Sequence, residues 1–135
     1  STSGNEDCHV ILRGGKTTNY DAASVDAAAR ELAAAGVPAR LMIDFSHANS
    51  SKNPQKQVDV GHDVGRQTGG GEDRIFGVMV ESHLKPGRQD LVPGKELVYG
   101  QSITDGCIGW EDSRALLDHL AEAVRKRRLK AAASQ

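Results

Sequence analysis

The chain has 135 residues, which favours one domain and excludes a complete parallel α/β barrel, a fold of about 250 residues. Its 17 basic and 18 acidic residues give a formal net charge of -1, so it lacks the overall basic field typical of nucleic-acid-binding proteins. Hydrophobic residues make up 38% and aromatic residues only 4%, so Val, Ile, Leu and Ala must form any core.

Three short apolar segments predict three strands, over residues 8–12, 40–45 and 75–80. Their apolar residues do not alternate cleanly with polar ones, which is typical of parallel strands buried on both faces. Polar side chains follow each segment directly. We therefore expect a parallel sheet with functional groups at the carboxyl ends of its strands.

Helices are predicted between and after these strands. The first, over 21–35, is rich in Ala and stops at Gly36. The second, over 54–66, begins with a proline suited to a first helical turn and is expected to close before the glycines at 69–71. The third, over about 112–128, has a stripe of Leu and Val, acidic residues early and basic residues late.

The chain thus contains three strand–helix units, and their spacing is regular. Arg13, His47 and Glu81 follow the three strands at intervals of 34 residues. Right-handed crossovers would place the strands side by side and parallel. Three such units suit part of a barrel better than a finished sheet, and they leave two open sheet edges. The segment 84–104 has no helical period, and it delivers Asp105 just before the last helix.

Three of the polar side chains predict a metal site. His47, Glu81 and Asp105 offer one imidazole nitrogen and two carboxylate donors, which suit Mn, Fe, Co or Zn. The alternative is that each is a solvated loop residue, because polar residues are common in loops. Their shared position after a strand favours the site.

Arg13 and the glycine that follows it predict an anion site. A guanidinium can bind phosphate through two hydrogen bonds, and Gly14 permits close approach of the backbone. An ordinary turn is the alternative. His83 is expected at the rim, outside the metal set. The basic run 125–130 lies at a helix carboxyl end and is expected to face water rather than nucleic acid.

Other features bear on where the protein works. No apolar run is long enough to span a membrane, and no secretory signal is visible. We expect a cytoplasmic protein in which Cys8 and Cys107 are reduced, and in which Cys107 is a small buried apolar residue. The chain begins Ser-Thr-Ser-Gly without Met, which suggests a piece cut from a longer protein.

Four motifs go beyond generic pattern: ILRGGK at 11–16, MIDFSHANSSK at 42–52, GVMVESH at 77–83 and SITDGCIGWEDS at 102–113. Together they resemble the C-terminal part of the class I phospho-2-dehydro-3-deoxyheptonate aldolases, or DAHP synthases. The resemblance runs from about residue 4 to residue 128. It implies that residues 1–135 are the last three βα units of a single (β/α)8 TIM barrel.

The resemblance also implies a function. DAHP synthases condense phosphoenolpyruvate with erythrose 4-phosphate at a divalent metal ion, opening the shikimate pathway to chorismate and the aromatic amino acids. Arg13 matches the arginine that binds the phosphate of phosphoenolpyruvate, and His47, Glu81 and Asp105 match three of four metal ligands. We expect His47 and Arg13 to be catalytic, and Arg13, Gly14 and Asp105 to bind substrate.

The chain departs from the family pattern because it lacks the first strand of the barrel. In the family, a cysteine on that strand is the fourth metal ligand, and neither Cys8 nor Cys107 matches this cysteine. The partners implied are the N-terminal part of the barrel and, for the intact enzyme, further copies of itself, with no nucleic acid and no membrane. A second hypothesis is a catalytically inactive fragment that only self-assembles through its exposed sheet edges.

Overall fold

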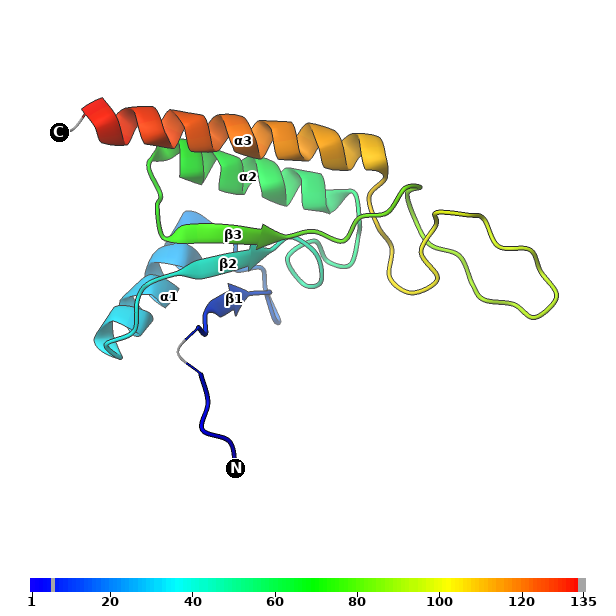
Figure 1. Ribbon diagram of the computed structural model, residues 1–135, viewed down its shortest axis with the longest axis horizontal. Helices are drawn as coiled ribbons and strands as arrows, with labels where there is room; N and C mark the ends of the chain where they lie inside the picture. The colour runs from blue at the N-terminus through cyan, green and yellow to red at the C-terminus, as the bar shows by residue number, and fades with distance from the viewer. Residues whose placement is uncertain (6, 134–135) are drawn as a thin grey trace.

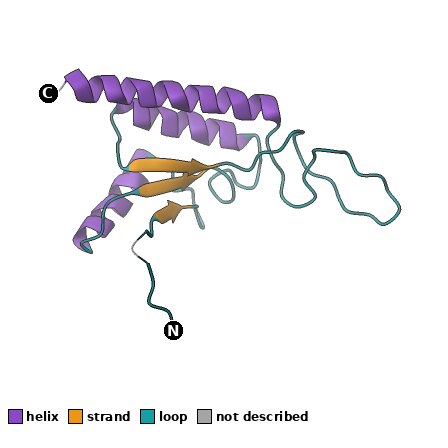
Figure 2. Ribbon diagram, viewed as in Figure 1, coloured by secondary structure: helices purple, strands orange, loops and turns teal. Residues whose placement is uncertain are grey.

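A computed structural model of the chain describes residues 1–5 and 7–133. Its elements alternate between strands and helices along the chain (Figures 1 and 2). In order they are β1 (Val10–Leu12), α1 (Ala22–Ala34), β2 (Leu41–Asp44), α2 (Lys56–Gly70), β3 (Ile75–Met79) and α3 (Trp110–Ala133).

The three strands form one parallel sheet in the order β1-β2-β3, which confirms the predicted strand arrangement. Leu12 of β1 lies beside Ile43 of β2. On the other side Leu41 pairs with Ile75 but Met42 pairs with Gly77, so one residue of β3 is left out of the register. Because all strands run the same way, their carboxyl ends meet at one edge of the sheet.

The core lies on one face of this sheet only. Leu12, Leu41 and Ile43 are buried and pack with apolar residues of all three helices. Alternate residues of the strands point to the opposite face, where Ile11 is 49% exposed and Met42 is half-buried. The prediction of strands buried on both faces is therefore wrong for this chain, because all the helices pack against the same face.

The ends of the helices follow local chemistry. Asp21 caps α1, where its carboxylate accepts hydrogen bonds from the Ser24 amide (3.0 Å) and hydroxyl (2.7 Å). Gly36 follows α1 with φ +70°, as expected for a helix end. The prediction that the second helix ends before Gly69 is wrong, since α2 continues through Gly70 and ends at Gly71 with φ +120°.

Glycines along α2 allow α3 to pack closely against it. Gly61 faces Leu116 of α3 and Phe45, Gly65 faces the ring of His119, and Gly69 faces Ala123. A Cβ at Gly61 would overlap Leu116 Cδ1 and lie 2.8 Å from Phe45 Cε2. These glycines lower the intrinsic helix propensity of α2, but they let the two backbones approach each other.

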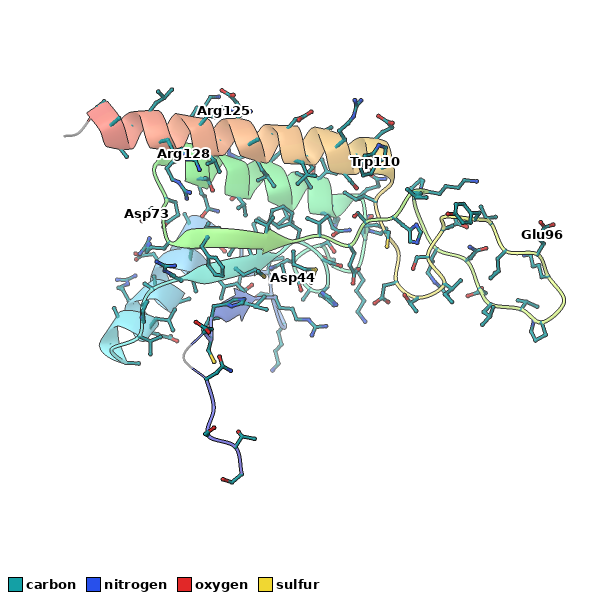
Figure 3. All side chains as sticks on the ribbon, viewed as in Figure 1. Asp44, Asp73, Glu96, Trp110, Arg125 and Arg128 are labelled. Atoms are coloured by element: carbon teal, nitrogen blue, oxygen red, sulfur yellow. The ribbon has the colours of Figure 1, made fainter. Side chains whose placement is uncertain are left out.

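The basic run near the end of α3 is only partly solvated. Arg125 is exposed and pairs with Glu122 at 3.6 Å (Figure 3). Arg127 instead donates to the carbonyls of Glu72 (3.0 Å) and Ile75 (3.3 Å), at the turn that leads into β3. Within the described residues this arginine is part of the packing between α3 and the sheet, a role that the sequence analysis missed.

A long loop joins β3 to α3 and projects away from the helices and sheet (Figure 1); Glu96 lies in its outer part and Trp110 begins α3 (Figure 3). Its base is closed by bridges between Ser82 and Ile108 and between Gly87 and Cys107. This closure returns the chain to the carboxyl edge of the sheet. Both cysteines are free, and no helix in the described part is long and apolar enough to cross a membrane.

We expect Gly61→Ala to destabilise the chain by about 1–3 kcal/mol, because the added methyl group overlaps the buried side chains of Leu116 and Phe45, which must shift to admit it. Gly70→Ala is the matched control. Its Cβ would meet nothing within 4 Å, so alanine at this last position of α2 should leave the free energy of unfolding unchanged or slightly raised. Urea unfolding followed by circular dichroism measures both variants. Equal stability of the two would contradict the close packing of α2 and α3.

Candidate functional site

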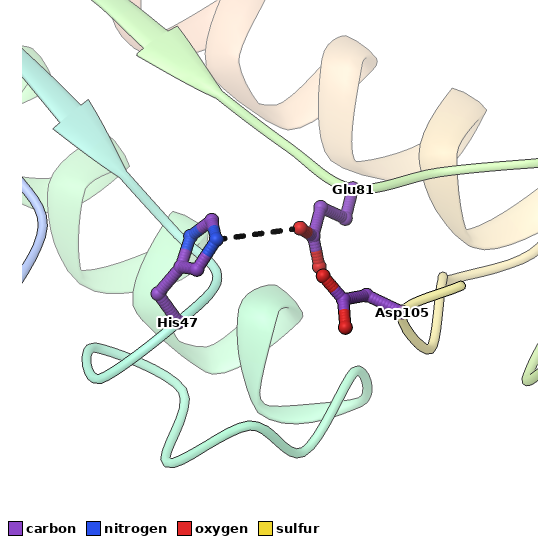
Figure 4. Close-up of side chains that lie close together, drawn as sticks. All are labelled: His47, Glu81 and Asp105. Atoms are coloured by element: carbon purple, nitrogen blue, oxygen red, sulfur yellow. Dashed lines mark ion pairs between the residues drawn. The ribbon is translucent and has the colours of Figure 1, made fainter.

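His47, Glu81 and Asp105 come together at the carboxyl edge of the sheet (Figure 4). His47 follows β2, Glu81 follows β3, and Asp105 comes from the end of the long loop. Each offers one ligand atom, and these atoms all lie within 4.8 Å of one another. His47 and Glu81, which are 34 residues apart in the sequence, therefore lie close together in space, and the long loop brings Asp105 to them.

A buried carboxylate orients the ring of His47. Asp44, the last residue of β2, is only 1% exposed, and its Oδ2 lies 2.8 Å from His47 Nδ1. Its other oxygen accepts a hydrogen bond from the Ser46 amide at 2.8 Å. An ionised carboxylate only accepts, so Nδ1 is the donor of this pair, and Nε2 is turned toward Glu81, whose Oε1 lies 3.6 Å away.

Two polar side chains hold Glu81. The Ser46 hydroxyl donates to Glu81 Oε2 at 2.6 Å. The fully buried Gln57 of α2 binds the Glu81 main chain twice, donating to its carbonyl (3.1 Å) and accepting from its amide (2.9 Å). Asp44, Ser46 and Gln57 were not among the site residues predicted from the sequence. The only sequence indication was a glutamine three positions before Val60, on the apolar face of α2.

An asparagine ties the loops after β1 and β2 together. The Asn49 amide donates to the carbonyls of Leu12 (3.1 Å) and Asp44 (2.8 Å), and its oxygen accepts from the Asn19 amide (2.8 Å). Gly14 belongs to the same junction: it has φ +74°, and its amide donates to Asn19 Oδ1 at 2.7 Å. The backbone of Gly14 therefore lies close to the loop after β2. The role of Gly14 in substrate binding stays a prediction.

The candidate ligands lie in an open pocket of about 280 Å³. Arg13, at the carboxyl end of β1, lines this pocket and forms no ion pair or side-chain hydrogen bond with other described residues. The lining consists of Arg13, Ser46, His47, Lys52, Glu81, Asp105 and Gly106. A guanidinium without a carboxylate partner, next to a possible metal site, is suited to an anionic ligand.

Two other residues near the site do not join the ligand group. His83 is exposed, and its Nδ1 accepts a hydrogen bond from the Leu84 amide at 2.8 Å. Cys107 is buried, as expected, and its thiol contacts the Asp105 carbonyl at 3.6 Å. Burial raises the pKa of this thiol, so it remains protonated at neutral pH and serves as packing rather than as a ligand.

The sequence profile of the DAHP synthetase I family matches residues 1–118. The chain belongs to this family. It is 61% identical over 128 residues to the Phe-sensitive phospho-2-dehydro-3-deoxyheptonate aldolase of Escherichia coli K12, covering 95% of this chain and 37% of that protein. It is 51% identical over 132 residues to the tyrosine-inhibited enzyme of Schizosaccharomyces pombe, covering 94% of this chain and 36% of that one.

A solved structure has the same fold. The phospho-2-dehydro-3-deoxyheptonate aldolase of Francisella tularensis SCHU S4 superposes with a TM-score of 0.88 at 44% identity, covering 93% of this chain and 37% of that chain. The chain therefore spans little more than a third of the length of its relatives. Membership of the DAHP synthetase I family implies a metal cofactor in general.

The donor set fits such a metal. One imidazole nitrogen and two carboxylate oxygens suit Mn, Fe, Co or Zn, and a carboxylate–histidine pair is the usual support of a metal-binding imidazole. The three donor atoms lie within 4.8 Å of one another, whereas two donors bound at about 2.1 Å to one tetrahedral ion are about 3.4 Å apart. The donors would therefore have to move closer together for all three to bind one such ion.

Asp44→Asn should weaken Mn²⁺ binding by about 10- to 100-fold, because it removes the charge that orients His47 and raises its basicity. Asp59→Asn, on the exposed side of α2, is the control and should bind Mn²⁺ as the parent does. Electron paramagnetic resonance of free Mn²⁺ gives the Kd, and circular dichroism verifies the fold. An unchanged Kd in Asp44→Asn would remove this carboxylate from the site.

Proposed function

We propose that this chain supplies the metal-binding wall and one phosphate-binding arginine of a DAHP synthase. The observation that carries the proposal is the meeting of His47, Glu81 and Asp105 with Arg13 in one pocket at the carboxyl edge of a parallel sheet. Parallel α/β folds bind their substrates at this edge. The relatives are named phospho-2-dehydro-3-deoxyheptonate aldolases, which supports this reaction for the enzyme to which the chain would contribute.

The reaction joins phosphoenolpyruvate to erythrose 4-phosphate. C3 of phosphoenolpyruvate attacks the aldehyde carbon, water adds at C2, and inorganic phosphate leaves, giving 3-deoxy-7-phosphoheptulonate. A divalent ion, when bound, polarises the aldehyde and stabilises the alkoxide that develops there. His47, Glu81 and Asp105 would hold that ion; which of Mn, Fe, Co or Zn serves is left open.

The residues of the chain have separate tasks in this scheme. Arg13 binds the phosphate of phosphoenolpyruvate and offsets its charge, while Asp44 keeps His47 in the tautomer that ligates through Nε2. Ser46 and Gln57 hold Glu81, which limits how far this ligand has to move when the ion enters. Gly14 and Asp105 complete the proposed substrate contacts.

The barrel belongs to the same proposal. A parallel sheet with every helix on one face, and with Ile11 49% exposed on the other, has the layout of part of a (β/α)8 barrel whose interior is uncovered. Residues 1–135 would be its last three units, and the segment that precedes them in the relatives would supply the rest. A cytoplasmic location and a homo-oligomeric intact enzyme are proposed with it.

Release of inorganic phosphate from phosphoenolpyruvate and erythrose 4-phosphate, with Mn²⁺ present, tests this function. We expect no activity from the chain alone, because its pocket is open to water on one side, and activity when the preceding segment of a relative is added. His47→Ala in the active mixture should lose both bound metal and rate. Full rate and full metal content in that variant would refute the ligand assignment.

A second candidate is self-assembly without catalysis. The outer edges of β1 and β3 have no strand partner in the described structure, and Val10 and Ile11 of β1 are exposed. Unpaired edges of this kind pair with other chains. In size-exclusion chromatography at increasing concentration, edge pairing predicts species larger than 14.4 kDa, which shrink when the preceding segment is added. A monomer at every concentration would contradict it.

A further inference from the structure

One cation in the pocket has no assigned role. Lys52 lines the same pocket as Arg13 and the three candidate ligands, and its side chain is exposed. Within the described residues it forms no ion pair and no side-chain hydrogen bond. Most surface lysines of this kind are simply solvated, so its position needs a second argument.

The backbone supplies that argument. His47, Ser51 and Lys52 have φ values of +53°, +53° and +59°, a region that non-glycine residues rarely adopt. Two hydrogen bonds close the segment, from the Lys52 amide to the His47 carbonyl (2.8 Å) and from the Ser51 amide to the Ala48 carbonyl (3.1 Å). Lys52 is thus fixed through its main chain to the residue that offers the imidazole ligand. Strain of this kind is concentrated at functional sites.

The charges of the pocket favour an anion with two negative charges. A divalent ion would offset the carboxylates of Glu81 and Asp105. The buried Asp44 does not line the pocket, and its two oxygens face the Ser46 amide and the His47 ring. Two positive charges, those of Arg13 and Lys52, then remain among the lining residues. A phosphate monoester at neutral pH carries nearly two negative charges.

We propose that Lys52 is a second phosphate-binding residue, which acts together with Arg13 on the phosphate of phosphoenolpyruvate and on the inorganic phosphate released from it. This inference rests on the proposed function. Arg13 supplies the planar, two-pronged contact, and Lys52 supplies a compact charge that can follow the phosphate as it leaves. Lys52 also sets specificity, because a substrate analogue without a phosphate gains nothing from it.

The test is isothermal titration calorimetry of the whole Mn²⁺-loaded chain, with inorganic phosphate, phosphoenolpyruvate and erythrose 4-phosphate in separate arms. Lys52→Gln should weaken binding of phosphate and phosphoenolpyruvate about tenfold, the usual scale for one charge-assisted contact. Lys52→Arg should restore most of the affinity. Lys56→Gln removes an exposed charge four residues later and should change neither Kd.

Each other outcome overturns the proposal in a recognisable way. Equal losses in Lys52→Gln and Lys56→Gln would mean a general effect of net charge. A loss confined to erythrose 4-phosphate would place Lys52 on the other substrate, and no phosphate binding by the parent chain would remove the site. The Kd for Mn²⁺, measured in parallel, separates the phosphate site from the proposed metal site. Lys52→Gln should leave this Kd unchanged, and His47→Ala should abolish Mn²⁺ binding. Unchanged Mn²⁺ binding in His47→Ala would count against the metal site instead.

Discussion

The site depends on one buried carboxylate. Asp44 is almost wholly removed from water, a costly place for a charge unless hydrogen bonds replace its hydration. It receives them from the Ser46 amide and the His47 ring, both within the same turn. A buried ion pair is weak support for stability, since apolar residues often do as well or better. The contribution of Asp44 is to fix the position of the ligand. It is the last residue of β2, it holds the turn that follows through the Ser46 amide, and it orients the imidazole of His47.

Glu81, the second candidate ligand, is also held in place by a buried polar side chain. Gln57 lies in the middle of an apolar interface, where an unpaired amide would cost about 1–3 kcal/mol, yet both ends of its side chain are used on the Glu81 main chain. Packing α2 onto the sheet therefore also fixes the end of β3. The glycines of α2 let α3 close over this helix, so the helix packing and the ligand geometry are parts of one arrangement.

Much of this could be read from the sequence. Apolar runs and their spacing predict the parallel order and the convergence of His47 and Glu81, because strand direction alone decides where their ends lie. The supporting hydrogen bonds could not be predicted, since Ser46 and Gln57 reach Glu81 from positions 35 and 24 residues away. The end of α2 could not be predicted for a related reason: Gly69 is typical of a helix end in the sequence, and only the packing of Ala123 from α3 against it accounts for its place inside the helix.

The uncovered face of the sheet and the pocket are linked by the same geometry. Along β2, Leu41 and Ile43 point toward the helices, while Met42 and Asp44 point the other way, and Asp44 is buried only because the chain folds over it after the strand. The candidate metal ligands therefore lie on the side of the sheet that carries no helices. In the proposed barrel that side is the interior, so whatever covers Ile11 and Met42 must also close the pocket.

Closing the pocket removes water from around Arg13 and the candidate ligands, which strengthens every charge interaction among them. Burial of the apolar face and activation of the site would then be a single event. The hydrophobic contact would drive it, and the stronger charge interactions at the metal would result from it.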